Sequence, residues 1–189
     1  MTVCIGYDPS STIGGWAVAI DGEPHTIGIW KPTKTSLAPI FRLSEFDTFC
    51  GFLMASYKPD VVTVEVIRVS TSHDTTRSLS RFEGVFIARA IGAGAEVIEY
   101  QVGQARSAFF GEGLGTMSKE QAYAAMRARY PQLPWLPADK TKAGDGKGGG
   151  MDQSDALIPA LCWEQVKARG EQIKADKKAK AARRRAQKT

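Results

Sequence analysis

Three segments near the start of the chain indicate its fold: VCIGYD (residues 3–8), WAVAI (16–20) and TIGIW (26–30). All three are short, apolar and rich in β-branched residues, and this composition predicts strands. Asp21-Gly22 separates the second segment from the third and predicts a tight hairpin turn. The chain is therefore expected to begin with three antiparallel strands.

Strands separated by helices follow this hairpin. The predicted elements, in chain order, are a helix near 38–57, a strand at 61–65, a helix near 75–92, a strand at 96–100, helices near 102–109 and 118–130, and a final helix from about 151. Antiparallel strands followed by strands that alternate with helices predict the α/β class, with a mixed five-stranded sheet flanked by helices.

Four acidic residues lie at the ends of these predicted elements. Asp8 ends the first strand and Glu65 ends the fourth, while Asp152 and Asp155 share one face at the start of the final helix. Clustered carboxylates in a partly desolvated pocket are unfavourable without cations, and oxygen ligands favour Mg²⁺ or Mn²⁺. The four acids together predict a divalent-metal site for phosphodiester chemistry.

Each acid also has a structural interpretation. Asp8 precedes Pro9 and could begin a turn, and Asp152 could cap or stabilise the first turn of its helix. Glu65 is harder to explain in this way, because a charge that ends four apolar strand positions must be exposed or paired. The combination of all four favours the functional interpretation.

The order of these motifs resembles the RuvC-type Holliday junction resolvases of the ribonuclease H-like superfamily. The resemblance rests on Asp8-Pro-Ser-Ser-x-x-Gly-Gly-Trp-Ala17, on Glu65, on Arg106-Ser-Ala-Phe-Phe-Gly-x-Gly113, on Lys119-x-Gln121 and on Asp152-x-x-Asp155. It covers roughly residues 2–165 and indicates a phage-type or otherwise divergent member. It implies a ribonuclease H-like fold and a Mg²⁺-dependent endonuclease that resolves four-way DNA junctions by paired, symmetric nicks.

The resemblance further implies two Mg²⁺ ions per active site, replaceable by Mn²⁺, which straddle the scissile phosphate. The metal ligands would be the four acids, and two basic residues would offset charge on the phosphate. The implied catalytic residues are Asp8, Glu65, Asp152, Asp155, Arg106 and Lys119.

Three features depart from the family pattern. Ser10 stands where the family usually has Gly after Asp-Pro, and the interval from Gly111 to Lys119 is longer than usual. The segment after Glu65 lacks the paired phenylalanines that wedge into the junction centre in the cellular enzymes. Arg68 or His73 could take their place, or the segment could be a flexible polar loop.

The predicted helix at 75–92 indicates an assembly. Its apolar residues are Leu79, Phe82 and Phe86 on one face, with Val85, Ala88 and Ile91 beside or across from it. An apolar surface wider than one stripe suggests burial on two sides. The family resemblance implies a homodimer through this helix, which suits symmetric nicking of a junction.

Positive charge is concentrated at the C-terminal end: ten Lys or Arg and two acids lie from residue 167 onward. We therefore expect a nuclease domain at 1–166 and a basic helical extension or tail at 167–189 that contacts phosphates non-specifically. The alternative is a tail that only aids solubility.

The Gly-rich end of segment 131–150 is expected to be mobile, either closing over DNA or serving as a linker. The predicted DNA contacts are Arg68, His73, Arg77, Lys140, Lys142, Lys147, Lys177, Lys178, Arg183, Arg184 and Arg185.

Three cysteines without metal-site spacing predict buried thiols. No segment is long and apolar enough for a membrane span and no charged leader precedes the first strand. We expect a protein of the cytoplasm of a bacterial or phage-infected cell that acts on branched DNA. The alternatives are another ribonuclease H-like nuclease for flaps, branched DNA or RNA·DNA hybrids, and a non-catalytic junction-binding protein. A sugar-kinase-type ATPase would need a longer chain.

Overall fold

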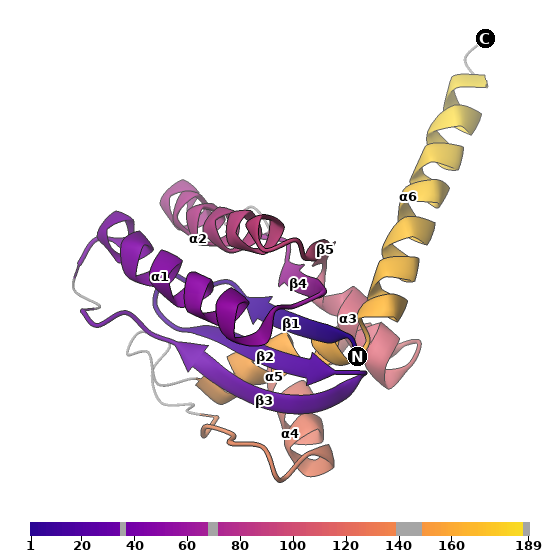
Figure 1. Ribbon diagram of the computed structural model, residues 1–189. Coiled ribbons are helices and arrows are strands. Elements are labelled where there is room, and N and C mark those ends of the chain that lie inside the picture. Colours follow the sequence, from indigo (N-terminus) through magenta and orange to yellow (C-terminus); the bar gives the residue numbers. More distant parts are fainter. Residues whose placement is uncertain (35–36, 68–71, 139–148, 187–189) are drawn as a thin grey trace.

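The computed structural model describes residues 1–34, 37–67, 72–138 and 149–186 (Figure 1). Residues 184–186 are described by their backbone alone. The strands are β1 (Val3–Asp8), β2 (Gly14–Ile20), β3 (Glu23–Trp30), β4 (Val61–Glu65) and β5 (Glu96–Tyr100). The helices are α1 (Pro39–Tyr57), α2 (His73–Gly92), α3 (Val102–Phe110), the 3₁₀ turn η1 (Leu114–Thr116), α4 (Lys119–Arg129), α5 (Gly149–Leu161) and α6 (Trp163–Ala186).

The five strands form one mixed sheet in the order β3-β2-β1-β4-β5. β1 and β2 pair antiparallel, as do β2 and β3, whereas β1, β4 and β5 run parallel. Asp21 and Gly22 both have positive φ angles, as expected for the predicted hairpin turn. The predicted α/β class and mixed five-stranded sheet are confirmed.

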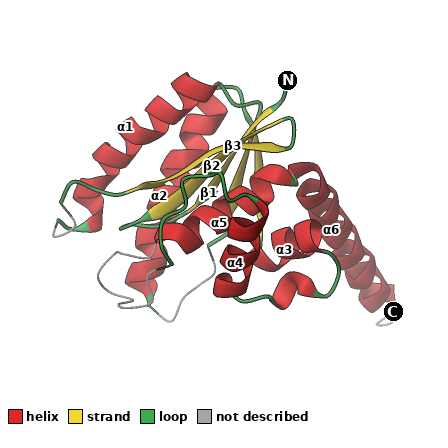
Figure 2. Cartoon of the chain, turned by 90° about the horizontal axis from the view of Figure 1, so that it is seen from below, coloured by secondary structure: helices red, strands yellow, loops and turns green. Residues whose placement is uncertain are grey.

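Helices cover both faces of the sheet (Figure 2). α1 and α2 pack side by side on one face, where Tyr7, Phe46, Phe82 and Phe86 are fully buried. α5 crosses the other face against β1 and β2, with α3 and α4 beside it. This arrangement places the start of α5 over the ends of the central strands.

Two glycines in the sheet allow α5 to lie unusually close to it. A Cβ atom at Gly6 would lie 1.9 Å from the Ala156 carbonyl oxygen, and one at Gly15 would lie 2.0 Å from the Asp152 carbonyl oxygen. The helix backbone therefore rests directly on the strand backbone, a contact that any side chain would prevent. The depth of α5, and of its two acids, is set by these glycines.

The sequence prediction of one final helix is wrong, because α5 ends at Leu161 and α6 begins at Trp163. The predicted domain boundary between 166 and 167 falls inside α6, where Val166 is buried and Lys167 Nζ lies 2.6 Å from Glu96 Oε1. Beyond this base α6 projects from the body (Figure 1). None of the helices in the described residues could span a membrane, judged by length and apolar character.

Two further expectations concern glycine and cysteine. Gly149 and Gly150 were expected in a mobile segment, but they lie buried in the first turn of α5. A Cβ atom at Gly150 would lie 2.2 Å from the Leu136 carbonyl oxygen, so close packing explains this glycine. The remainder of that segment, 139–148, lies outside the described residues. The three cysteines are buried thiols, as predicted.

Candidate active site

Asp8 and Glu65 end two neighbouring parallel strands, at the same edge of the sheet. Tyr7 pairs with Val64 in the β1–β4 register, so the acid that follows each of them lies at the strand end. Burial raises the pKa of Asp8 well above its usual value; Lys119 opposes this shift, and the carboxylates of Asp152, Asp155 and Glu65 add to it. The four predicted acids therefore lie near enough to interact electrostatically.

Three of these acids surround one lysine ammonium. Lys119 Nζ lies 3.1 Å from Asp8 Oδ2, 2.7 Å from Asp152 Oδ1 and 3.2 Å from Asp155 Oδ2. Burial disfavours this charge, but the three carboxylates together raise the pKa of Lys119 above its usual value. The lysine is therefore protonated and lies among carboxylates supplied by β1 and α5.

In the described part of the chain, no three or more His, Cys, Asp or Glu side chains are arranged as a ready metal site. The three carboxylates face the Lys119 ammonium instead. Their chemistry nevertheless fits a divalent cation, because they supply oxygen ligands that already converge on one positive centre.

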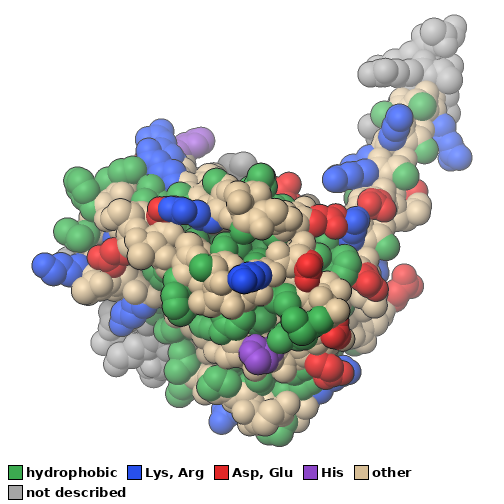
Figure 3. All heavy atoms as spheres, viewed as in Figure 1, with side chains coloured by type: hydrophobic (Ala, Val, Ile, Leu, Met, Phe, Trp, Pro, Cys, Tyr) green, Lys and Arg blue, Asp and Glu red, His purple; other side chains and the backbone are tan. Residues whose placement is uncertain are grey.

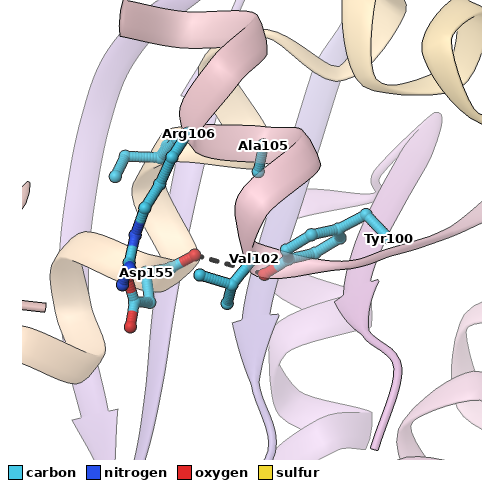
Figure 4. A pocket seen from close by; sticks show the side chains of 6 residues that line it. Tyr100, Val102, Ala105, Arg106 and Asp155 are labelled. Atoms are coloured by element: carbon cyan, nitrogen blue, oxygen red, sulfur yellow. Dashed lines mark hydrogen bonds and ion pairs between the residues drawn. The ribbon is translucent and has the colours of Figure 1, made fainter. Parts of the chain in front are cut away.

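Arg106 holds the carboxylate oxygen of Asp155 that does not face Lys119. Its Nη2 donates to Asp155 Oδ1 at 2.8 Å, and its Nη1 donates to the Met117 carbonyl at 2.5 Å. Figure 4 shows the two side chains pointing toward each other from α3 and α5. The expected contact of Arg106 with a substrate phosphate is not supported by this geometry, because the residue is only 7% exposed. Arg106 orients a carboxylate instead.

The backbone of Asp155 is held by a residue that sequence reasoning missed. Pro159 has no N–H group, so the carbonyl of Asp155, four residues earlier in α5, lacks its helical donor. The Tyr100 hydroxyl donates to this carbonyl at 3.2 Å (Figure 4). Burial keeps the pKa of Tyr100 well above its usual value, with Glu65, Asp8 and Asp155 adding to the shift, so the hydroxyl remains a donor. The proline four positions after the acid was the available signal.

The start of α5 is anchored to the segment that precedes it. Leu136 N donates to Gln153 Oε1 at 2.9 Å, and the Tyr123 hydroxyl donates to the Leu136 carbonyl at 2.7 Å. Gln153 is itself buried, which fixes the helix turn that carries Asp152. The described part of segment 131–150 that contains Leu136 therefore packs against α4 and α5.

Five of the predicted DNA-contacting residues have described side chains, and these lie on α2 and α6. His73 and Arg77 are exposed near the start of α2, where Arg77 Nη1 lies 4.0 Å from Asp74 Oδ1. Lys177, Lys178 and Arg183 are exposed on α6, which begins near the start of β5, at the opposite end of the strands from the acids (Figure 1). The remaining predicted contacts, Arg68, Lys140, Lys142, Lys147, Arg184 and Arg185, lie outside the residues or side chains that are described.

The predicted dimer helix α2 has one buried face and one exposed face. Phe82 and Phe86 are fully buried, and Phe86 stacks on Tyr7 with ring centroids 4.6 Å apart. The outward residues include Gly84, Ala88 and Ile91, and Ile91 is 63% exposed. The two phenylalanines therefore belong to the core, and any second copy on α2 would contact its smaller outer side chains.

A family model described as crossover junction endodeoxyribonuclease RuvC matches residues 4–138. The protein of that name from Halorhodospira halophila is 30% identical over 166 residues, which cover 86% of this chain and 89% of that protein. The one from Pseudoalteromonas atlantica is 26% identical over 166 residues, covering 86% of both chains. The family-model match ends before α5, so it leaves out Asp152 and Asp155.

Solved structures share the fold. A structure of T. thermophilus RuvC in complex with Holliday junction substrate has a TM-score of 0.66 and 18% identity, covering 87% of this chain and 94% of that one. The yeast mitochondrial Holliday junction resolvase has a TM-score of 0.55 and 13% identity, covering 87% of this chain and 80% of that one. The ribonuclease H-like fold predicted from the sequence is confirmed by this likeness.

Proposed function

The chain belongs to the RuvC family of crossover junction endodeoxyribonucleases, and we propose that it resolves four-way DNA junctions with divalent cations held by Asp8, Glu65, Asp152 and Asp155. The observation that supports this site most directly is the convergence of three carboxylates on one positive charge. Mg²⁺, with Mn²⁺ as its substitute, suits oxygen ligands best, and two ions per site are proposed.

The four acids of this site are positioned by different parts of the fold. Asp8 and Glu65 are fixed by adjacent strands, and Asp152 and Asp155 by a helix packed on glycine. Arg106 and Tyr100 hold the side chain and the backbone of Asp155. When bound, divalent cations would supply activation of the attacking water and stabilisation of the leaving oxygen.

The proposed substrate has two-fold symmetry, and we propose a matching homodimer through the outer face of α2. Two sites related by a two-fold axis would nick two strands of like polarity. Figure 3 shows Lys and Arg side chains along the projecting helix α6. These cations support non-specific contact with DNA phosphates at a distance from the acids. The cytoplasmic location inferred from the sequence stays a prediction.

The test uses purified protein with Mg²⁺ on a four-way junction, a duplex, a flap and an RNA·DNA hybrid. We expect paired symmetric nicks in the junction, with ends that DNA ligase seals. Equal cleavage of flap or hybrid would favour the broader ribonuclease H-like activity instead. Binding without cleavage of any substrate would favour a junction-binding protein.

Variants of the acids assign the site. Asp8→Asn, Glu65→Gln and Asp155→Asn should abolish cleavage yet keep junction binding, measured by fluorescence anisotropy in Ca²⁺. Glu164→Gln, which changes an exposed carboxylate at the start of α6, is the matched control and should cut normally. Full cleavage by any of the first three variants would remove that residue from the metal site.

A further inference from the structure

Lys119 reaches the acidic cluster from a firmly built helix start. It is the first residue of α4, behind the N-cap Ser118, whose side chain accepts from Gln121 N while the Gln121 side chain accepts from Ser118 N. The backbone at Lys119 is therefore fixed. The ammonium at the end of its flexible side chain lies among oxygens from Asp8, Asp152 and Asp155.

The two cations that contact Asp155 differ in how firmly they are held. The Arg106 side chain is 9% exposed and is also tied to the Met117 carbonyl, whereas the Lys119 side chain is 37% exposed. Asp155 Oδ1 faces Arg106, and Asp155 Oδ2 faces Lys119. Arg106 is thus a permanent part of the site, while Lys119 can swing toward solvent about its side-chain bonds.

We propose that Lys119 is a resident counterion of the acidic cluster that incoming divalent cations displace, so that this lysine sets how tightly the site binds them. The proposal rests on the proposed metal chemistry. Its physical basis is direct competition, because Mg²⁺ contacts ligand oxygens at about 2.1 Å and repels a like charge held between the same oxygens. Displacement also frees the ammonium to face a DNA phosphate at the solvent edge of the site.

Competition makes opposite predictions for stability and for metal binding when the lysine is removed. Without divalent cations, removing the ammonium leaves three mostly buried carboxylates with less neutralising charge, which destabilises the fold. With divalent cations, the same change removes the competitor, so binding tightens. If Lys119 had a merely structural role, removing it would lower the stability of the protein without tightening metal binding.

The experiment measures Mn²⁺ binding by calorimetry and by the electron paramagnetic resonance signal of free Mn²⁺, without DNA. We compare the wild type with Lys119→Met and Lys119→Gln. The control is Lys167→Met, which removes a lysine paired with one exposed carboxylate at the start of β5. Both Lys119 variants should bind Mn²⁺ at least about tenfold more tightly than the wild type, and the control should match the wild type.

Thermal unfolding, recorded over a series of Mn²⁺ concentrations, covers variants that are too unstable without metal for calorimetry. For these, Mn²⁺ should raise the unfolding temperature more than it does for the wild type. Equal or weaker Mn²⁺ binding, or an equal thermal shift, in the Lys119 variants would overturn the displacement. Junction cleavage by the wild type then separates the two proposals: cleavage with no gain in affinity overturns the displacement alone, and a wild type that neither binds Mn²⁺ nor cuts overturns both.

Discussion

Replacing Gly15 by alanine tests whether the sheet glycines position the acids of the proposed metal site. The new Cβ atom would lie 2.0 Å from the Asp152 carbonyl oxygen, 2.2 Å from its carbonyl carbon and 2.7 Å from Gln153 N. All three are backbone atoms, so no side chain can move aside. To reach an ordinary contact of 3.4 Å, the start of α5 must retreat by about 1.4 Å.

Two consequences follow from this displacement. Overpacking of this kind costs about 1–3 kcal/mol of stability, and a misplacement of about 1 Å at a catalytic group costs about 10²-fold in rate. Gly15→Ala should therefore remain folded but cut a four-way junction about a hundredfold more slowly in single-turnover assays. Urea unfolding of the same sample gives the free energy of unfolding, so that loss of fold and loss of geometry are measured apart.

Gly170→Ala is the matched control, because a Cβ atom at Gly170 in α6 meets nothing within 4 Å. This change should leave cleavage intact and should slightly stabilise the helix, since alanine is the better helix former. If Gly15→Ala cut junctions at the wild-type rate, the close contact between β2 and α5 would not set the position of Asp152.

Three further outcomes are expected. Ile91→Asp should convert the dimer into folded monomers in sedimentation equilibrium, and a wild type that is monomeric at micromolar concentration would contradict symmetric nicking by a dimer. Deleting residues 174–189 should weaken binding to junction and duplex equally and flatten the salt dependence, so a selective loss of junction binding would show that the tail reads branch shape. Tyr100→Phe should lower the free energy of unfolding by about 1 kcal/mol, because the Asp155 carbonyl loses its donor. Adding Pro159→Ala should restore this stability by giving the same carbonyl a helical N–H donor. If the effects of the two changes on the free energy of unfolding were additive, Tyr100 would not substitute for the missing helical donor.

The strands and the acids could be predicted because their signals are local. Alternation and β-branching mark β1, and a charge at the end of an apolar run marks Asp8 without any knowledge of the neighbours. The convergence of Asp155 with Asp8 could be expected only from the order of the motifs, since the two residues lie near opposite ends of the chain. The contact itself depends on Gly6 and Gly15, whose meaning emerges once α5 is packed on the sheet.

Side-chain partners could not be predicted, because sequence shows residue type and not burial. Arg106 and Lys119 are both basic residues near the same motif, yet one is buried behind Asp155 and the other lies at the solvent edge. Phe86 lies on a helix with apolar residues on several sides, and periodicity alone does not say which side faces the sheet. The stacking of Phe86 on Tyr7 shows that the Phe86 side of the helix faces the sheet.

The packing of α5 also has a consequence for the newly made protein. β1 and β2 precede α5 in the chain, so ribosomes produce these strands before the helix that supplies Asp152 and Asp155. Until that helix docks, Gly6 and Gly15 are not covered by its backbone and Asp8 lacks Asp152 and Asp155 as neighbours, so the proposed metal site is incomplete. Contacts between segments so far apart in the chain are slow to form, because the long intervening loop must first be closed. The proposed metal site therefore forms only after α5 has been synthesised and has packed on the sheet.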